Sequence, residues 1–303
     1  MRRWITSFLL LIMLLMVGLT AGAAELYCDY CGERIIGKYV RVNEKGAGVK
    51  SYCPSCFHRH IERTCSVCGE PLTGKYLVDV YGNEYHPEHR KSHHCDSCGR
   101  IISERTSGGG VMLPDGRTIC NICHRYAVRD NPTLAGLMHR TAGILTGIGI
   151  EIPVGNIQVA LIDRNQLQAL YRGGYAKHVR GLCVSEFKRV KNIQYPAHRH
   201  IIYILSSMSV LDTETALAHE LTHAYINERP ALRQKLQRQG IEEGMCQFMS
   251  FIYLSRGNTE EILARLKGIA HNRNPIYGEG FRKVHKMFEG GTTDDLVAFL
   301  SNP

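Results

Sequence analysis

The chain has 303 residues, which is long enough for two domains or for one domain preceded by small modules. Hydrophobic residues make up 44% and charged residues 21% of the chain, which excludes a wholly disordered protein. The formal net charge is +9, but the sequence has no long Lys/Arg run, so nucleic acid is not an expected partner.

The first 23 residues have the pattern of a secretory signal peptide. Arg2 and Arg3 precede an apolar run at residues 8–19, and residues 21–23 form an A-x-A cleavage motif. The run is shorter than the roughly 20 apolar residues that span a bilayer, although an uncleaved anchor remains the alternative. We expect an exported protein, periplasmic or secreted, with no membrane contact beyond residues 1–23.

Ten of the twelve cysteines form five Cys-x-x-Cys pairs, and the pattern C-x-x-C-G recurs along this segment. Such repeats indicate an array of small units, each too small to hold a core alone. Two sets contain four cysteines with 21 residues between their pairs: Cys28, Cys31, Cys53 and Cys56, and Cys95, Cys98, Cys120 and Cys123. The middle set combines two cysteines with two histidines: Cys65, Cys68, His86 and His89.

Metal ligation explains these sets better than disulfide bonding does. An exported chain rich in cysteine usually forms disulfides, and that alternative stays open. Histidine cannot form a disulfide but is a common zinc ligand, so the pairing of His86 and His89 with cysteines favours zinc. His93 and His94 are alternatives to His89. We therefore predict three structural zinc ions.

The cysteine pairs end before residue 125, and the composition changes from residue 132 onward. Apolar residues at helical spacing predict a helix over residues 132–149. Apolar β-branched runs predict strands at residues 157–162 and 200–205, and residues 181–187 are a third candidate. The stretch 164–200 carries the weakest pattern.

Two further helices complete the α+β layout. The first carries two histidines and has Asp212 or Thr213 as its candidate cap. The second should cover about residues 241–255. With a boundary within residues 125–131, the predicted organisation is a signal peptide (1–23), a zinc ribbon (24–60), a LIM-like double zinc module (61–128) and a catalytic domain (129–303).

Residues 219–223 read His-Glu-Leu-Thr-His, the pattern H-E-x-x-H. Positions i and i+4 share one face of a helix, so His219 and His223 can bind the same ion. Glu220 is offset around the helix and can touch a water on that ion without ligating it. Two surface histidines on an amphipathic helix are the alternative explanation of this short pattern.

A catalytic zinc needs a third protein ligand, for which Glu243 is the candidate. Nineteen residues separate His223 from Glu243, a spacing that resembles the thermolysin-like zincins, or gluzincins. Gly244 would allow the second helix to approach the metal closely. Glu242 is the rival ligand, but it lies about 100° around the helix from Glu243.

These residues predict peptide-bond hydrolysis by a zinc-activated water, with Glu220 as general base. The oxyanion needs a further donor, and Tyr277 is preferred over His271 and His285. Three other residues have expected supporting roles, with Gln247 orienting a ligand histidine and Cys183 and Cys246 packing in the core.

Taken together, the cysteine modules and three C-terminal motifs resemble the DA-one family of LIM peptidases. The motifs are A-H-E-L-T-H-A-Y from residue 218, E-E-G-M-C-Q from residue 242 and Y-G-E-G-F-R from residue 277. The resemblance implies that His219 and His223 bind zinc and that Glu220 is catalytic. Its plant members are ubiquitin-activated metallopeptidases that limit organ growth. This chain differs in its signal peptide, its extra N-terminal ribbon and its lack of an evident ubiquitin-interacting helix.

The sequence therefore predicts an exported zinc metallopeptidase with one catalytic and three structural zinc ions. Its substrate would be a protein or peptide, and LIM-like modules imply a protein partner that they bind without taking part in the chemistry. The competing function is a zinc-stapled binding scaffold with an inactive peptidase-like domain. An intact Glu220 favours the enzyme, because a scaffold has no use for a general base.

Overall fold

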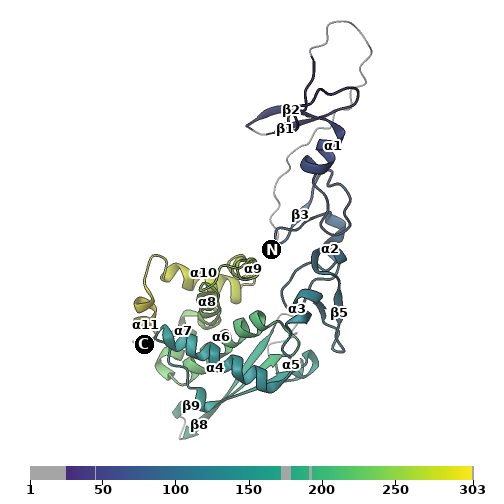
Figure 1. Ribbon diagram of the computed structural model, residues 1–303. Helices are drawn as coiled ribbons and strands as arrows, with labels where there is room; N and C mark the ends of the chain where they lie inside the picture. Colours follow the sequence, from purple (N-terminus) through teal and green to yellow (C-terminus); the bar gives the residue numbers. More distant parts are fainter. Residues whose placement is uncertain (1–24, 45, 172–178, 191–192, 302–303) are drawn as a thin grey trace. The chain divides into compact units, whose positions relative to one another are not determined.

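The computed structural model describes residues 25–44, 46–171, 179–190 and 193–301, which form two compact units (Figure 1). One unit ends at Ser92, and the other covers His93–Pro303. The predicted signal peptide lies outside the described residues. None of the described helices is both long and apolar enough to cross a bilayer.

The first unit is built from two short antiparallel hairpins, each followed by a brief helical turn. The first hairpin and its turns are β1 (Val40–Glu44), β2 (Gly48–Tyr52), α1 (Pro54–Cys56) and the π-helical turn η1 (Phe57–Ile61). The second comprises β3 (Leu77–Val78), β4 (Glu84–Tyr85) and the 3-10 turn η2 (Pro87–Lys91). The apolar cluster of the first hairpin is small, which agrees with the expectation that such modules need a staple.

The second unit begins with a third hairpin module and continues into a larger mixed α/β body. The module contains α2 (Glu104–Ser107), β5 (Gly110–Met112), β6 (Thr118–Cys120) and α3 (Asn121–Arg125). The boundary between compact units falls at residues 92–93, inside the predicted LIM-like double module, and the domain boundary at residues 125–131 stays a prediction. Hydrogen bonds join the third hairpin module to the later helices over sequence distances that no local pattern reveals.

A three-stranded sheet forms one layer of the larger body. Its order is β7 (Ile157–Ile162), β9 (Ile193–Leu205) and β8 (Gly181–Val190), with β9 parallel to β7 and antiparallel to β8. The three predicted strands are confirmed, although β9 begins earlier than expected.

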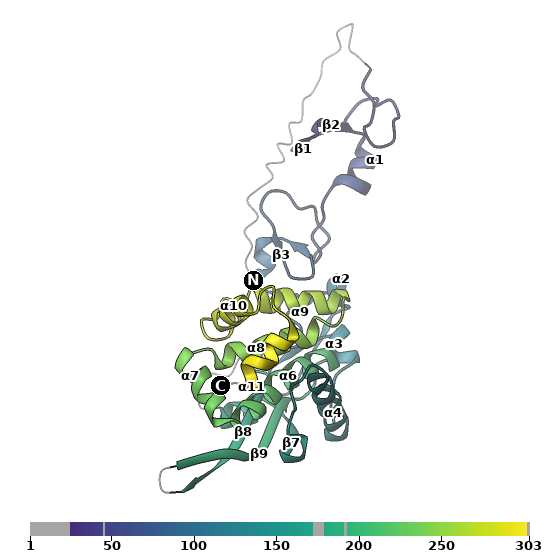
Figure 2. The same ribbon diagram turned by 90° about the vertical axis from the view of Figure 1, so that its left-hand side faces the viewer.

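The helices of this body include α4 (Asn131–Gly147), α5 (Arg164–Leu170), α6 (Val210–Asn227), α7 (Pro230–Gln239), α8 (Glu242–Leu254), α9 (Glu260–Ala270), α10 (Tyr277–Met287) and α11 (Thr293–Ser301). The predicted helices at residues 132–149 and 241–255 correspond to α4 and α8. Helix α4 packs on β7, and α6 packs on β8 and β9 (Figure 2).

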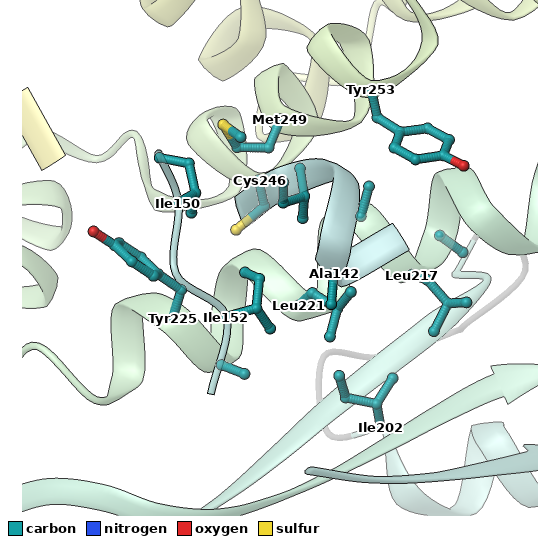
Figure 3. Packing of buried hydrophobic residues seen from close by; sticks show 14 of the residues in the cluster. Ala142, Ile150, Ile152, Ile202, Leu217, Leu221, Tyr225, Cys246, Met249 and Tyr253 are labelled. Atoms are coloured by element: carbon teal, nitrogen blue, oxygen red, sulfur yellow. The ribbon is translucent and has the colours of Figure 1, made fainter. Parts of the chain in front are cut away.

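Helix α6 occupies the centre of the body. Ile202 of the sheet lies below Leu217 and Leu221 of α6, while Cys246 and Met249 of α8 lie above (Figure 3). A helix that packs on both sides has buried residues around most of its circumference, as α6 has. Its histidines are therefore carried by a rigid and well-supported element.

The N-cap of helix α6 lies three residues before Asp212, the first of the two predicted caps. Ser209 is the N-cap, and its hydroxyl accepts a hydrogen bond from the Asp212 backbone N–H. Asp212 lies inside the first turn, where its carboxylate accepts a 2.6 Å hydrogen bond from the Ser209 hydroxyl. The predicted start of the helix is therefore close to the observed one. Asp212 is not the N-cap itself but accepts a hydrogen bond from the N-cap residue Ser209.

Candidate metallopeptidase site

Helix α6 presents His219 and His223 side by side. Their ring centroids lie 5.1 Å apart, and both side chains are 14% exposed. The spacing of four residues places them one turn apart on the same face. The partial exposure keeps both rings accessible while the rest of the helix is buried.

Helix α8 brings Glu243 to this pair from its first turn. Glu243 Oε2 lies 3.1 Å from His219 Nε2 and 3.5 Å from His223 Nε2. Nitrogen and oxygen ligands at about 2.0–2.2 Å around one tetrahedral zinc are about 3.3–3.6 Å apart. The three ligand atoms therefore fit a single zinc ion.

The electrostatics of the site keep Glu243 ionised. Burial alone would raise the pKa of Glu243, but hydrogen bonds and positive charge from His219 and His223 hold it well below its usual range. A carboxylate that stays ionised among imidazole nitrogens is a suitable ligand for a divalent ion.

Glycines set the position of Glu243. Gly244 of α8 packs directly on the backbone of Gly280 in α10, and a Cβ atom at Gly244 would overlap that backbone. The two helices can approach this closely only without side chains at the contact. The sequence anticipated the close packing of Gly244, although its contact proves to be α10.

Glu220 points from α6 toward the first residues of β8. It is 6% exposed, and a Cβ atom at Gly181 would lie 2.8 Å from its Cγ. Its carboxylate accepts a hydrogen bond from the backbone N–H of Cys183. Burial and the charge of Glu243 raise the pKa of Glu220 even though His219, His223 and this hydrogen bond oppose the shift. A carboxylate of raised pKa is better matched to proton transfer near neutral pH.

Tyr277, the first residue of α10, reaches the same site. Its ring centroid lies 6.1 Å from that of His219. Burial, the charge of Glu243 and a hydrogen bond with Tyr171 raise its pKa, so the phenol keeps its proton as a donor. Tyr171 was not anticipated, because it lies in the stretch with the weakest sequence pattern.

The other two donor candidates have different surroundings. His285 packs against the rings of Phe248, Phe251 and Phe281. His271 ends α9, where its Nδ1 atom lies 2.9 Å from the carbonyl oxygen of Lys267. Tyr277 is the member of this set that the structure places beside His219.

Two neighbours of Glu243 also contact the site. Glu242 Oε1 lies 3.6 Å from Nδ1 of His223, where it can help to orient that ring, and the orienting role of Gln247 stays a prediction. Cys246 is fully buried, and its sulfur lies within 4.8 Å of the ligand atoms of His219 and His223. Burial raises the pKa of Cys246 to about 12.

Cys183 lies on β8 beside Glu220. Burial raises its pKa to about 12. A neutral thiol packed at this position agrees with the predicted core role.

Three Cys/His clusters have the geometry of structural zinc sites. In each cluster, one ligand atom per residue lies within 4.8 Å of all the others, and none of the twelve cysteines, all of which lie in the described residues, forms a disulfide bond. The clusters are Cys28, Cys31, Cys53 and Cys56; Cys65, Cys68, His86 and His89; and Cys95, Cys98, Cys120 and Cys123. Sequence spacing had grouped the same twelve residues.

Distances within the clusters support zinc as the metal. The sulfur atoms of Cys98 and Cys120 are 3.8 Å apart, and four thiolates at about 2.3 Å from one zinc have a similar separation. In the middle cluster, Nε2 of His86 lies 3.1 Å from the Pro71 carbonyl oxygen, while Nδ1 lies 3.5 Å from the Cys68 sulfur. This arrangement leaves Nδ1 to bind the metal while Nε2–H donates to the carbonyl.

We expect the mature protein to hold four zinc ions. Glu243→Ala should lose one of them, because it removes the oxygen that lies near both imidazoles, while Glu242→Ala should keep all four. Mass-spectrometric metal analysis of protein purified without chelator checks both variants. Loss of zinc from Glu242→Ala but not from Glu243→Ala would show that Glu242 is the ligand.

Comparison with known proteins identifies relatives of this chain. A family model described as DA1-like (Protein DA1) matches residues 197–266, the segment that includes His219, Glu220, His223 and Glu243. Among curated proteins, the chain is 27% identical over 202 residues to the LIM domain-containing protein HDR3 of Oryza sativa subsp. japonica, covering 57% of this chain and 39% of that protein.

A second relative matches more of the chain. Protein DA1-related 2 of Arabidopsis thaliana is 25% identical over 327 aligned residues, covering 85% of this chain and 60% of the relative. The chain thus spans between two fifths and three fifths of the length of these two relatives. No solved structure matches it significantly. By these matches and its Cys/His modules, the chain is similar to DA1-type LIM-domain proteins.

Proposed function

We propose that the His93–Pro303 unit contains a zincin-like (gluzincin) domain that hydrolyses peptide bonds. The observation that carries this proposal is the convergence of His219, His223 and Glu243 beside a buried Glu220 that does not belong to the ligand set. A purely structural metal site would have no use for an additional buried carboxylate, because burying one is costly unless it serves a purpose.

The roles of the residues follow from their positions. When bound, zinc supplies a Lewis acid that polarises the scissile carbonyl. Glu220 accepts a proton from the attacking water and passes it to the leaving amine, while the Cys183 N–H holds its carboxylate in place. The Tyr277 phenol donates a hydrogen bond to the oxygen that gains negative charge. Glu242 keeps the ring of His223 oriented.

The sheet suggests how a substrate is held. β8 pairs with β9 along one side, and within the described residues no strand pairs with its outer side. Glu220 bonds to the backbone of this strand at Cys183, so the outer edge of β8 runs past the general base. An extended peptide can add to such an edge through main-chain hydrogen bonds, which makes an unfolded protein segment the expected substrate.

The zinc modules of the first unit have a proposed role in binding other proteins. LIM-type modules generally mediate protein interactions, and we propose that those formed by residues 25–92 bind the substrate or a partner protein. Their expected ligand sets are filled by protein atoms, which leaves no open position for chemistry. Export, proposed from residues 1–23, would place this activity in the periplasm or outside the cell.

Removal of the catalytic metal tests the enzyme against a scaffold that only binds peptides. We expect protein depleted of one zinc by brief chelation to lose hydrolysis of an unstructured protein such as casein, and to regain it with one equivalent of zinc. The structural sites should lose metal more slowly, because all four of their ligands come from the protein. Equal hydrolysis rates before and after depletion would reject the proposal, whereas unchanged casein binding without hydrolysis in the zinc-loaded protein would favour the scaffold.

A further inference from the structure

The Cys95 cluster lies in a module that is hydrogen-bonded to the start of α6, the helix that carries His219. We call residues 93–125, which contain Cys95, Cys98, Cys120 and Cys123, the third module. It belongs to the same compact unit as α6. Other polar residues of this module form hydrogen bonds with residues that lie far away in the sequence. Zinc binding does not require these bonds.

The first bond comes from Ser97, which lies between two of the zinc-ligand cysteines. Its hydroxyl donates a 2.6 Å hydrogen bond to Asp212 Oδ2 and accepts one of 3.0 Å from the Ser209 backbone N–H. Ser97 and Asp212 are both fully buried. Ser209 is the N-cap of α6 and Asp212 lies in its first turn, so one hydroxyl of the third module contacts both residues that begin the helix.

The second link passes through α9. Arg265 balances the buried charge of Asp212, with Nε 3.1 Å from Oδ1 and Nη2 3.0 Å from Oδ2. Arg100 of the third module donates a 2.6 Å hydrogen bond to Glu261, which lies one turn before Arg265 on α9. The third module, α6 and α9 therefore share a single network of charged side chains, in which Asp212, Arg265 and Arg100 are buried and Glu261 is partly exposed.

The third link holds the turn that leads into α6. Ser207 has φ = 60°, a left-handed backbone conformation that non-glycine residues rarely adopt. Its N–H donates to the carbonyl oxygen of Val128 at 2.8 Å, and Arg117 donates to the carbonyl oxygen of Ser206 at 2.8 Å. Arg117 is 1% exposed and is fixed by Asp115, so the strained turn is held by the third module and the segment that follows it.

We propose that the zinc site of the third module is a clamp that fixes the start of α6, so that metal occupancy there controls the placement of His219 and Glu220. Asp212 lies seven residues before His219, about 10 Å along the helix axis. Short segments of this kind depend on their metal for folding, so loss of zinc would release Ser97. Asp212 would then remain buried without one of its donors. The clamp does not depend on the proposed peptidase activity.

Hydrogen exchange measured by mass spectrometry on full-length protein tests the clamp. Cys98→Ser should lose one zinc, and the amides of residues 210–219 should exchange at least about tenfold faster than in wild type. Cys68→Ser, which removes a zinc ligand from the other compact unit, is the matched control and should leave these amides unchanged. If Cys98→Ser loses its zinc and exchange in α6 does not change, the clamp is refuted.

A second variant keeps the test informative even if Cys98→Ser does not fold. Ser97→Ala retains every zinc ligand, so it should keep its full zinc content and still accelerate exchange in residues 210–219. Ser103→Ala is its control, because Ser103 caps α2 inside the same module. In the double variant Cys98→Ser/Ser97→Ala, exchange should match Cys98→Ser alone. No effect from Ser97→Ala, or fully additive effects in the double variant, would show that the zinc site does not act through Ser97.

Discussion

Replacement of Glu220 by glutamine is expected to reduce peptide hydrolysis by about 10²–10⁴-fold while the fold and zinc content stay unchanged. The amide has nearly the same shape, so it can still pack against Gly181, and its oxygen can still accept from the Cys183 N–H. It cannot accept the proton of the attacking water. Initial rates of casein hydrolysis, with metal analysis of the same samples, measure both quantities.

The control is a second buried carboxylate on the same helix. Glu214 is 6% exposed, accepts a 2.6 Å hydrogen bond from Arg140, and lies five residues before His219 in the chain. Glu214→Gln should lower the free energy of unfolding and leave the hydrolysis rate near that of wild type. Hydrolysis by Glu220→Gln at a rate close to wild type would remove Glu220 from the mechanism.

Substitution of Gly244 by alanine is expected to destabilise the domain and to empty the proposed catalytic metal site. The added Cβ atom would overlap the backbone of Gly280, which cannot move aside as a flexible side chain can. Overpacking typically costs about 1–3 kcal/mol, and a contact between two backbones should reach the upper part of that range. Displacement of α8 would also carry Glu243 away from His219, so we expect one zinc to be lost.

Gly143 provides the matched substitution. It lies in α4, and a Cβ atom there would meet nothing within 4 Å. Gly143→Ala should therefore raise the free energy of unfolding by roughly 0.5–1 kcal/mol, since alanine favours the helix over glycine. Urea denaturation and zinc analysis separate the two variants. If Gly244→Ala were as stable and as zinc-rich as Gly143→Ala, the close contact between α8 and α10 would not be what positions Glu243.

Local spacing was enough to predict the residues that the structure brings together at the candidate site. The i, i+4 relation placed His219 and His223 on one face, and the spacing of nineteen residues after His223 selected Glu243. The same reasoning grouped the three Cys/His clusters, because zinc ligands in small modules come in closely spaced pairs. These features depend on helix geometry and ligand chemistry, which a single sequence displays directly.

Features that depend on long-range packing could not be predicted in this way. Tyr171 reaches Tyr277 across more than a hundred residues, from a segment whose composition gave no signal. The bonds of Ser97 to Asp212 and Ser209 join residues 112 to 115 positions apart. They also explain why the third module groups with α6 and not with the two modules before it. In the sequence, Ser97 is a serine between two cysteines, and no local pattern predicts its contacts with α6.

We infer that this chain cuts peptide bonds with the residues around His219, and a proteome-wide profile of new N-termini is the sharpest test of that activity. An extract of unfolded proteins would be incubated with wild type or with Glu220→Gln at equal zinc content. We expect a reproducible set of new N-termini that is produced by wild type and is absent from the Glu220→Gln sample. Identical profiles for the two proteins, with both shown to be folded and fully loaded with zinc, would contradict it.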